Sequence, residues 1–267
     1  MTPSAPRRLK KALFRLALHL PPGLRRLASS PATRGLRDRF FRPGGETELV
    51  RDTIHWMDLV FPFTAPYQVL ERARTRGVEN RICRLARSVL EPGDLAVDVG
   101  ANYGFVSLVA AHAVAPDGKV ISFEIVPAVR AAMQSSVDAA GLSAVVHLVD
   151  RGAGDVEKGD LTTVDAALEA VGAELERFKF LKIDVDGLDF AVLRGAARSL
   201  RAAKPAVVIE MTRDGAEIFE LLKELGYTHF MDQDQEPVDG SSAAGPSAAW
   251  PENLIASCEP LRIPPPS

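Results

Sequence analysis

From about Asn80 onward, short hydrophobic runs alternate with amphipathic stretches. Runs of four or five residues rich in Val and Ile are typical of strands buried on both faces, whereas apolar residues three and four positions apart predict helices. The expected strands are residues 95–99, 120–124, 145–149, 180–184, 207–210, 228–231 and 254–258. The expected helices are residues 105–113, 127–139, 164–176, 188–202 and 216–225.

This alternation predicts an α/β fold, with a doubly wound, mainly parallel sheet covered by helices on both faces. Residues 232–252 carry Gly, Pro, Ser and acidic residues without a helical period, so the last two strands should form an antiparallel pair. The main domain is therefore expected at residues 80–260. Residues 46–79 have mixed patterning with several aromatic side chains and predict a small ordered N-terminal cap, and the proline-rich residues 261–267 predict a frayed tail.

The first 45 residues form a basic arm and linker. Apolar residues recur at helical spacing between residues 7 and 20, with Arg8, Lys11 and Arg15 on the other side, and two prolines end the pattern. Arg15 interrupts the apolar core that a secretory signal needs. Three interpretations of this N-terminal helical extension stay open: a helix on an anionic membrane surface, an organelle-targeting sequence, or a solvated lid or dimerisation helix.

The composition excludes several classes of protein. The 267 residues are 46% hydrophobic and 25% charged, which excludes a collagen-like, low-complexity or wholly disordered chain. Cys83 and Cys258 are the only cysteines, so the sequence offers neither a disulfide framework nor a Cys-based zinc site, and a reducing, cytoplasmic location is expected. No apolar run approaches the about 18 to 20 residues of a spanning helix.

Charge is divided unevenly along the chain. Residues 1–45 hold 11 Lys and Arg against one acid, so the arm carries +10 and the rest of the chain −13, for a net −3. We therefore expect the arm to have its own partner, such as a peripheral contact of residues 1–42 with the inner membrane surface. Basic residues in the acidic body are scattered, which argues against a nucleic-acid partner.

The sharpest local motif is DVGANYG at residues 98–104, between an expected strand and an expected helix. Gly100 and Gly104 allow a tight turn and a close approach of the backbone to a ligand, and Asp98 precedes them on the strand. Ala101 and Asn102 stand where the dinucleotide fingerprint has its second glycine. In an open α/β sheet, nucleotide-like ligands bind beyond the carboxyl end of this strand, although a purely structural turn is the competing explanation.

Glu124 ends the second strand, 26 residues after Asp98. A carboxylate at that place can accept hydrogen bonds from both hydroxyls of a ribose. The two signals together predict a ribose-bearing ligand without requiring a pyrophosphate, and S-adenosylmethionine fits this description. Its adenosine would lie in the crevice and its amino-acid tail over the glycine turn.

A series of motifs runs along the expected main domain: PGD at 92–94, DVGANYGF at 98–105, GKV at 118–120, FE at 123–124, TVD at 163–165, LKIDVDG at 181–187, VLRGA at 192–196, KP at 204–205 and Glu210. In this order, the motifs resemble those of the FkbM family of S-adenosylmethionine-dependent methyltransferases. The resemblance covers residues 80–212 best. It departs at Asp186, where the family usually has Glu, at residues 188–189, usually Ala-Glu, and at residues 152–155, where an Ala-Leu pair is customary.

The resemblance implies a Rossmann-like class I methyltransferase fold and methyl transfer to an oxygen of a small metabolite, sugar or glycan. Asp184 ends the fourth strand beside the expected donor site, and Asp186 follows two residues later. Either carboxylate could orient the acceptor or act as general base, while capping of the next helix competes as the role of Asp186. We predict Asp184 and Asp186 as catalytic residues and Asp98, Gly100, Ala101, Asn102, Gly104 and Glu124 as cofactor-binding residues.

Several alternatives stay open. Glu210 and Asp184 would give Mg²⁺ only two oxygen ligands, so no metal site is assigned. His112, His147 and His229 have no partner visible in the sequence. The phosphate-loop, serine-hydrolase and zinc-peptidase motifs are missing. A nucleotide-binding oxidoreductase and a non-catalytic, membrane-associated scaffold are the competing functions.

Overall fold

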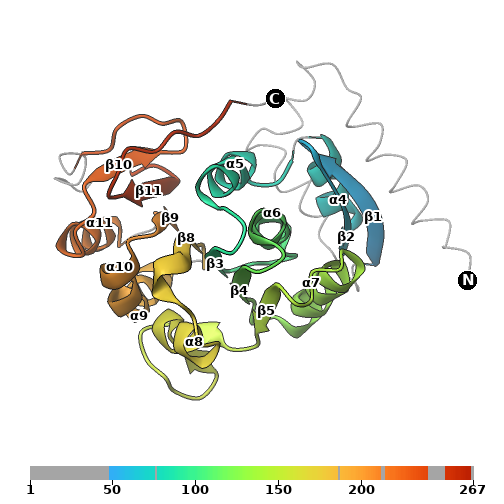
Figure 1. The fold of residues 1–267 in the computed structure, drawn as a ribbon, viewed down its shortest axis with the longest axis horizontal. Coiled ribbons are helices and arrows are strands. Elements are labelled where there is room, and N and C mark those ends of the chain that lie inside the picture. Colours follow the sequence, from blue (N-terminus) through green and yellow to red (C-terminus); the bar gives the residue numbers. More distant parts are fainter. Residues whose placement is uncertain (1–47, 76, 186, 212–213, 240–249, 266–267) are drawn as a thin grey trace, which may run out of the picture. The chain divides into compact units, whose positions relative to one another are not determined.

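The computed structural model describes residues 48–75, 77–185, 187–211, 214–239 and 250–265 (Figure 1). The strands are β1 (Leu49–Trp56), β2 (Leu59–Pro66), β3 (Leu95–Val99), β4 (Lys119–Phe123), β5 (Val146–Val149), β6 (Gly152–Ala153), β7 (Leu161–Thr162), β8 (Phe178–Ile183), β9 (Ala206–Glu210), β10 (His229–Asp232) and β11 (Asn253–Ser257). The helices are α4 (Tyr67–Thr75), α5 (Asn80–Val89), α6 (Phe105–Val114), α7 (Pro127–Ala139), α8 (Val164–Ala170), α9 (Asp189–Gly195), α10 (Ala197–Ala203) and α11 (Gly215–Glu224), with a 3-10 turn at Leu175–Arg177.

A seven-stranded sheet forms the centre, in the order β10-β11-β9-β8-β3-β4-β5. Strands β5, β4, β3, β8 and β9 pair in parallel, and β11 pairs antiparallel with both β9 and β10. The strand order reverses direction beside β3, so the carboxyl ends of β3 and β8 flank a topological switch point. The predicted doubly wound, mainly parallel sheet with its antiparallel C-terminal strand is confirmed.

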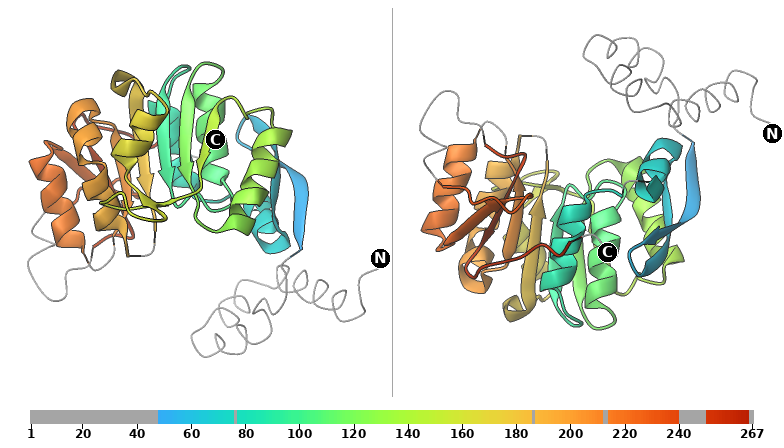
Figure 2. Two further views of the ribbon diagram at one scale, coloured as in Figure 1. Left: turned by 90° about the horizontal axis from the view of Figure 1, so that it is seen from below. Right: turned by 90° about the horizontal axis from the view of Figure 1, so that it is seen from above.

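Two helical layers enclose the sheet, as the views of Figure 2 show. On one face, α5, α6 and α7 pack on apolar side chains such as Ala96, Val120 and Phe180. On the other face, α8 to α11 cover Val97, Ile121 and Leu181 among others. Every side chain of β3 is buried, which explains why this strand is a continuous apolar run broken only by Asp98.

Residues 49–75, within the predicted N-terminal cap, form a hairpin and a helix. The strands β1 and β2 pair along their whole length, and α4 follows directly. Their aromatic side chains surround Phe105 of α6, with ring centroids 5.5 Å away for Phe63 and 5.6 Å for Phe61. This segment therefore shares one hydrophobic core with the sheet, and the domain boundary at residue 79 stays a prediction.

The structure differs from the sequence-based elements at two helices and at the C-terminal residues. The expected helix at 188–202 is divided into α9 and α10 after Gly195, where a Cβ atom would lie 1.9 Å from the carbonyl oxygen of Gly154. The helix expected at 164–176 ends at Ala170, before Gly172, which has a positive φ of 62°. Ile263, within the tail predicted to be frayed, is buried and donates its N–H to Gln235, so the described part of this tail is attached to the domain at that residue.

The arm at residues 1–45 lies outside the described residues. Within the described part of the chain, no helix has the length and apolar character needed to cross a membrane.

Candidate active site

The glycine turn, residues 100–104, joins β3 to α6. The N–H groups of Gly100 and Ala101 both donate to the carbonyl oxygen of Phe123, which ties the turn to the end of β4. Gly100 has φ 80°, and a Cβ atom there would lie 1.9 Å from the carbonyl oxygen of Asp184. Glycine is thus required because the chain leaving β8 passes directly against this turn.

Asn102 lies at the exposed tip of the turn with a left-handed φ of 53°. Asn tolerates this conformation better than most residues with a side chain. Gly104, with φ 86°, precedes α6, and a Cβ atom at this position would lie 2.5 Å from Cγ of Met133. The second glycine therefore serves helix packing, and the predicted role in close ligand approach falls to residues 100–102.

Glu124 follows β4 at the edge of the turn. Its carboxylate accepts hydrogen bonds from the N–H groups of Asn102, at 3.0 Å, and Val126, at 2.7 Å. An ionised carboxylate has about four acceptor positions. Two of them therefore stay available for ribose hydroxyls, so the residue fits its predicted role. Tyr103 lies nearby, where burial and the charge of Glu124 raise the pKa of its phenol, which keeps it a neutral hydrogen-bond donor.

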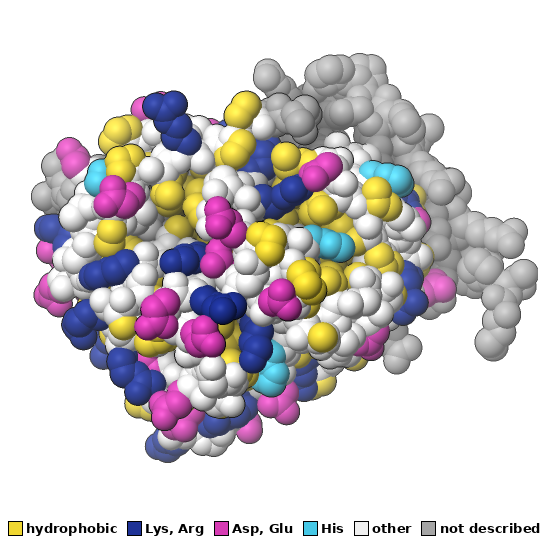
Figure 3. Space-filling view, viewed as in Figure 1, with side chains coloured by type: hydrophobic (Ala, Val, Ile, Leu, Met, Phe, Trp, Pro, Cys, Tyr) yellow, Lys and Arg dark blue, Asp and Glu magenta, His cyan; other side chains and the backbone are white. Residues whose placement is uncertain are grey.

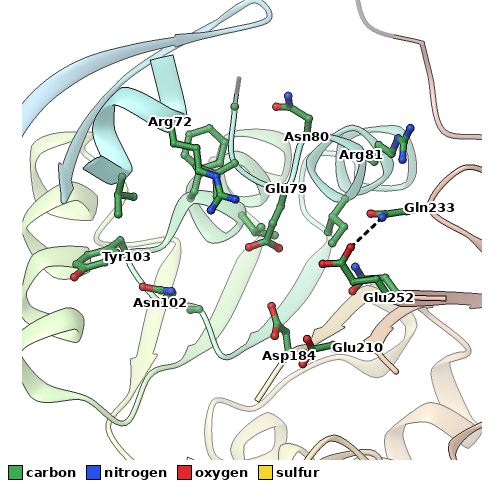
Figure 4. A pocket seen from close by; sticks show the side chains of 18 of the residues that line it. Arg72, Glu79, Asn80, Arg81, Asn102, Tyr103, Asp184, Glu210, Gln233 and Glu252 are labelled. Carbon is green, nitrogen blue, oxygen red and sulfur yellow. Dashed lines mark hydrogen bonds between the residues drawn. The ribbon is translucent and has the colours of Figure 1, made fainter. Parts of the chain in front are cut away.

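A cavity of about 590 Å³ opens beside the turn and has the size of a small-molecule site (Figure 4). Its floor includes Ala101 and Asn102, and the strand-end residues Asp184 and Glu210 lie at its lower edge in the view of Figure 4. Residues from the N-terminal segment 46–79 and from the segment 232–252 also line the cavity. The lining residues from them are Phe63, Val69, Arg72, Gly77, Val78, Glu79, Gln233 and Glu252.

Asp184 enters this cavity directly after β8. Its N–H donates to the carbonyl oxygen of Val99 at 3.1 Å, which fixes it beside the end of β3. One carboxylate oxygen accepts a hydrogen bond from Nζ of Lys182 at 3.0 Å. The predicted catalytic carboxylate is thus held at the junction of β3 and β8, while Asp186 lies outside the described residues.

Lys182 is buried within β8, its side chain only 3% exposed, and is surrounded by carboxylates. Its Nζ lies 3.0 Å from Asp184, 3.5 Å from Glu79 and 3.8 Å from Asp98. Burial alone would lower the pKa of the ammonium, but the charges of Asp98, Glu79 and Asp184 raise it above its ordinary value. Lys182 therefore remains charged throughout the physiological range and binds the three acids together.

Asp98 lies beneath the glycine turn, 2% exposed. It accepts a hydrogen bond from Oγ of Ser107 at 2.5 Å, and Ser107 in turn accepts one from Ser122. Burial raises the pKa of the Asp98 carboxyl, while Lys182 and Ser107 act in the opposite direction. The Asp98 side chain thus contacts α6 and β8 directly, and β4 through Ser107, and it does not line the cavity. Its contact with the cofactor stays a prediction.

Of the predicted site residues, Ala101, Asn102 and Asp184 line the cavity, and Gly100, Gly104 and Glu124 support the turn beside it. Several charged residues of the site were not predicted, among them Glu79 and Lys182. Lys182 carried a usable signal, because a lysine between Leu181 and Ile183 breaks an otherwise apolar central strand. Glu79 carried none, since its approach to Lys182 depends on tertiary packing.

In the described part of the chain, neither a histidine nor a cluster of possible metal ligands lines the cavity. Among the described residues, no group of three or more His, Cys, Asp or Glu side chains is placed to hold a metal ion. His112 packs on Phe61, and burial lowers its pKa. Neither it nor His147 nor His229 lines the cavity.

Comparison with known proteins agrees with this geometry. Residues 154–228 match the methyltransferase FkbM domain. This match confirms the predicted family resemblance over that part of the chain. The FkbM match begins at residue 154, so the glycine turn and the hairpin of β1 and β2 precede it, and it ends before β10. The search of curated proteins found no match.

Several solved methyltransferases are similar in structure. An S-adenosylmethionine-dependent O-methyltransferase from Thermotoga maritima is 19% identical, with a TM-score of 0.46 over 82% of this chain and 80% of that one. Methyltransferase FkbM from Methylobacillus flagellatus KT is 17% identical, with a TM-score of 0.42 over 62% of this chain and 43% of that one. An rRNA methylase from Streptococcus thermophilus is 12% identical, with a TM-score of 0.42 over 65% and 90%.

Proposed function

We propose that this protein is an S-adenosylmethionine-dependent methyltransferase that methylates a hydroxyl oxygen of a small metabolite, sugar or glycan. The observation that carries the proposal is that one cavity joins the glycine turn to the carboxylate at the end of β8. The FkbM match supports the methyltransferase class. A nucleic-acid acceptor is disfavoured, since acidic and basic side chains are interspersed over the face shown in Figure 3.

The residues present fit the cofactor. The cavity is large enough for it, the turn at Gly100 leaves no side chain in the way, and Glu124 keeps two acceptor positions for a ribose. Glu124 would bind the ribose, and the turn at Ala101 and Asn102 would bear the amino-acid tail. When bound, S-adenosylmethionine supplies a methyl group already activated by its sulfonium, so the protein mainly has to align the acceptor.

Asp184 is suited to that alignment. Its backbone is fixed to β3 and its carboxylate is held by Lys182, so the free oxygen can accept a hydrogen bond from an acceptor hydroxyl. The hairpin, α4 and the strand β11 enclose the far side of the cavity, where they would select the acceptor.

Methyl transfer from tritium-labelled S-adenosylmethionine to matched hydroxyl and amine acceptors tests the proposal. The panel holds methyl glycosides, polyols and phenols beside the corresponding amino compounds, with mass spectrometry of each product. We expect label on oxygen only, and at least a 100-fold lower rate for Asp184→Asn. Transfer to amines alone, or S-adenosylhomocysteine binding without transfer to any acceptor, would reject O-methylation, and the latter result would favour the scaffold.

The basic arm has a separate proposed role, placement of the enzyme at the cytoplasmic face of a membrane. Eleven cationic side chains in 45 residues would attract anionic lipids. When phosphatidylserine-containing vesicles are sedimented, the full chain should appear in the pellet with them. A chain lacking residues 1–42 should stay in the supernatant. Equal sedimentation of the two chains would exclude the arm as the membrane contact.

A further inference from the structure

Glu79 stands at a constrained turn between α4 and α5. Its backbone is left-handed, with φ 49°, and its carbonyl oxygen accepts the N–H of Cys83 at 2.9 Å. Gly77 lies two residues before Glu79, and the side chain of Asn80 fills the space that a Cβ atom at Gly77 would occupy. Trp56 of the hairpin donates to Asn80 at 2.7 Å. Hairpin and turn together direct the Glu79 side chain into the cavity (Figure 4).

Lys182 connects Glu79 to the predicted catalytic carboxylate. The same ammonium lies 3.5 Å from Glu79 and 3.0 Å from Asp184, so two carboxylates converge on the cavity floor from opposite sides. Lys182 donates the shorter hydrogen bond to Asp184, at 3.0 Å, and lies 3.5 Å from one oxygen, Oε2, of Glu79. Both oxygens of Glu79 therefore retain acceptor positions for a ligand. Asp98, the third acid, is sealed beneath the turn.

The charges around Glu79 come from several elements. Burial raises the pKa of its carboxyl, with Lys182 lowering it and the negative charges of Asp98 and Asp184 raising it. A carboxylate with a raised pKa is a better proton acceptor at working pH. The other titratable or charged groups that face it or line the same cavity among the described residues are Cys83, Arg72, Arg81, Tyr103, Glu210 and Glu252.

We propose that Glu79 is the general base of the reaction, an inference that rests on the proposed function. The acceptor hydroxyl lies between the two carboxylates, with Asp184 orienting it. As the oxygen forms its bond to the methyl carbon, the carbon–sulfur bond breaks and its electron pair passes to sulfur. The hydroxyl proton moves to Glu79, so the products are a methyl ether, a neutral thioether and a protonated Glu79. No further reactant is needed.

Glu79→Gln tests this assignment because it keeps the shape and removes the base. Glu79→Asp keeps the carboxylate on a shorter side chain, and Glu91→Gln makes the same change at an exposed glutamate beyond the other end of α5. Three measurements are compared: S-adenosylhomocysteine binding by calorimetry, the pH dependence of methyl transfer to whichever hydroxyl acceptor of the panel the wild-type chain methylates, and carbon-13 NMR titration of labelled glutamate carboxyls.

We expect Glu79→Gln to bind S-adenosylhomocysteine within about threefold of wild type but to transfer methyl at least 100-fold more slowly. Wild-type turnover should rise with pH and level off as Glu79 ionises. Glu79→Gln should lack that plateau, and Glu79→Asp should recover part of the rate. The NMR signal that disappears in Glu79→Gln should titrate above 4.5, the ordinary value of a glutamate.

Other outcomes overturn the proposal. Wild-type-like turnover of Glu79→Gln, titration at or below 4.5, or loss of S-adenosylhomocysteine binding would each remove Glu79 as the base, the last by making it a cofactor-binding residue. If the wild-type chain binds S-adenosylhomocysteine but methylates no hydroxyl, the proposed function itself fails and the assignment falls with it. Glu91→Gln should match wild type in all three measurements.

Discussion

The buried ammonium of Lys182 allows a quantitative prediction for Lys182→Met. Met is similar in length and apolar, so the substitution fills the space but leaves Asp98 and Glu79 without their counter-charge. Removing one partner of a buried ion pair typically costs about 3–5 kcal/mol. Because a carboxylate can escape this cost by binding a proton, the penalty has a limit that depends on pH.

That limit follows from the ordinary pKa of Asp98, 3.8. Keeping the carboxyl protonated in the folded state costs about 1.36 kcal/mol for each pH unit above that value. Because burial already raises the Asp98 pKa in the wild-type chain, the loss from this carboxyl stays below about 4 kcal/mol at pH 7 and below about 1.6 kcal/mol at pH 5. The direction of the pH dependence is that of an acid whose folded pKa is raised. The stability contributed by protonated Asp98 is fully present below pH 3.8 and is lost as the pH rises through the folded pKa.

Urea unfolding of the wild-type and Lys182→Met chains at pH 5 and pH 7 measures this difference. We expect a loss of about 3–4 kcal/mol at pH 7 and at most about half of that at pH 5. Lys179→Met is the matched control, because Lys179 is exposed on the same strand, and it should change stability by under about 0.5 kcal/mol. A loss that is equal at both pH values, or below about 1 kcal/mol at pH 7, would refute the reasoning.

Three further substitutions test other parts of the site. Asp184→Asn should lower turnover at least 100-fold while the melting temperature changes by only a few degrees, and equal activity would remove Asp184 from the catalytic residues. Gly100→Ala should lower the free energy of unfolding by about 2 kcal/mol or more, because the added Cβ would meet the Asp184 carbonyl. Its control is Gly159→Ala, which should cost only about 1 kcal/mol, because Gly159 has φ 58° and nothing lies within 4 Å of the added Cβ. Equal losses would contradict the close approach of the Asp184 carbonyl to Gly100. Glu124→Gln should weaken S-adenosylhomocysteine binding about tenfold in calorimetry, and unchanged affinity would exclude a ribose contact.

The sheet could be predicted from the sequence because its central strands are buried on both faces, which produces apolar runs of the length typical of strands. The glycine turn was also predictable, since Gly100 and Asn102 lie in left-handed conformations that few other residues adopt. The hairpin was not anticipated. Pro62 lies inside β2 and Pro66 ends it, and prolines argue against a strand. The burial pattern of β2 is not a regular alternation, because Phe63 packs on Phe105 of α6.

The rest of the site depended on contacts between distant segments. The sequence motif includes Lys182, but only the fold shows that three carboxylates from different segments surround it. Similarly, the break between α9 and α10 follows from the close passage of Gly195 against Gly154, which lie 41 residues apart. A helical period carries no information about such an approach.

Calorimetric titration of the full chain with S-adenosylhomocysteine and, separately, with NAD tests the central claim most directly. The cavity is lined by the glycine turn, to which Glu124 is hydrogen-bonded, and we expect it to bind S-adenosylhomocysteine with one site per chain and to leave NAD unbound. Binding of NAD alone would contradict the account and make the chain a nucleotide-binding oxidoreductase.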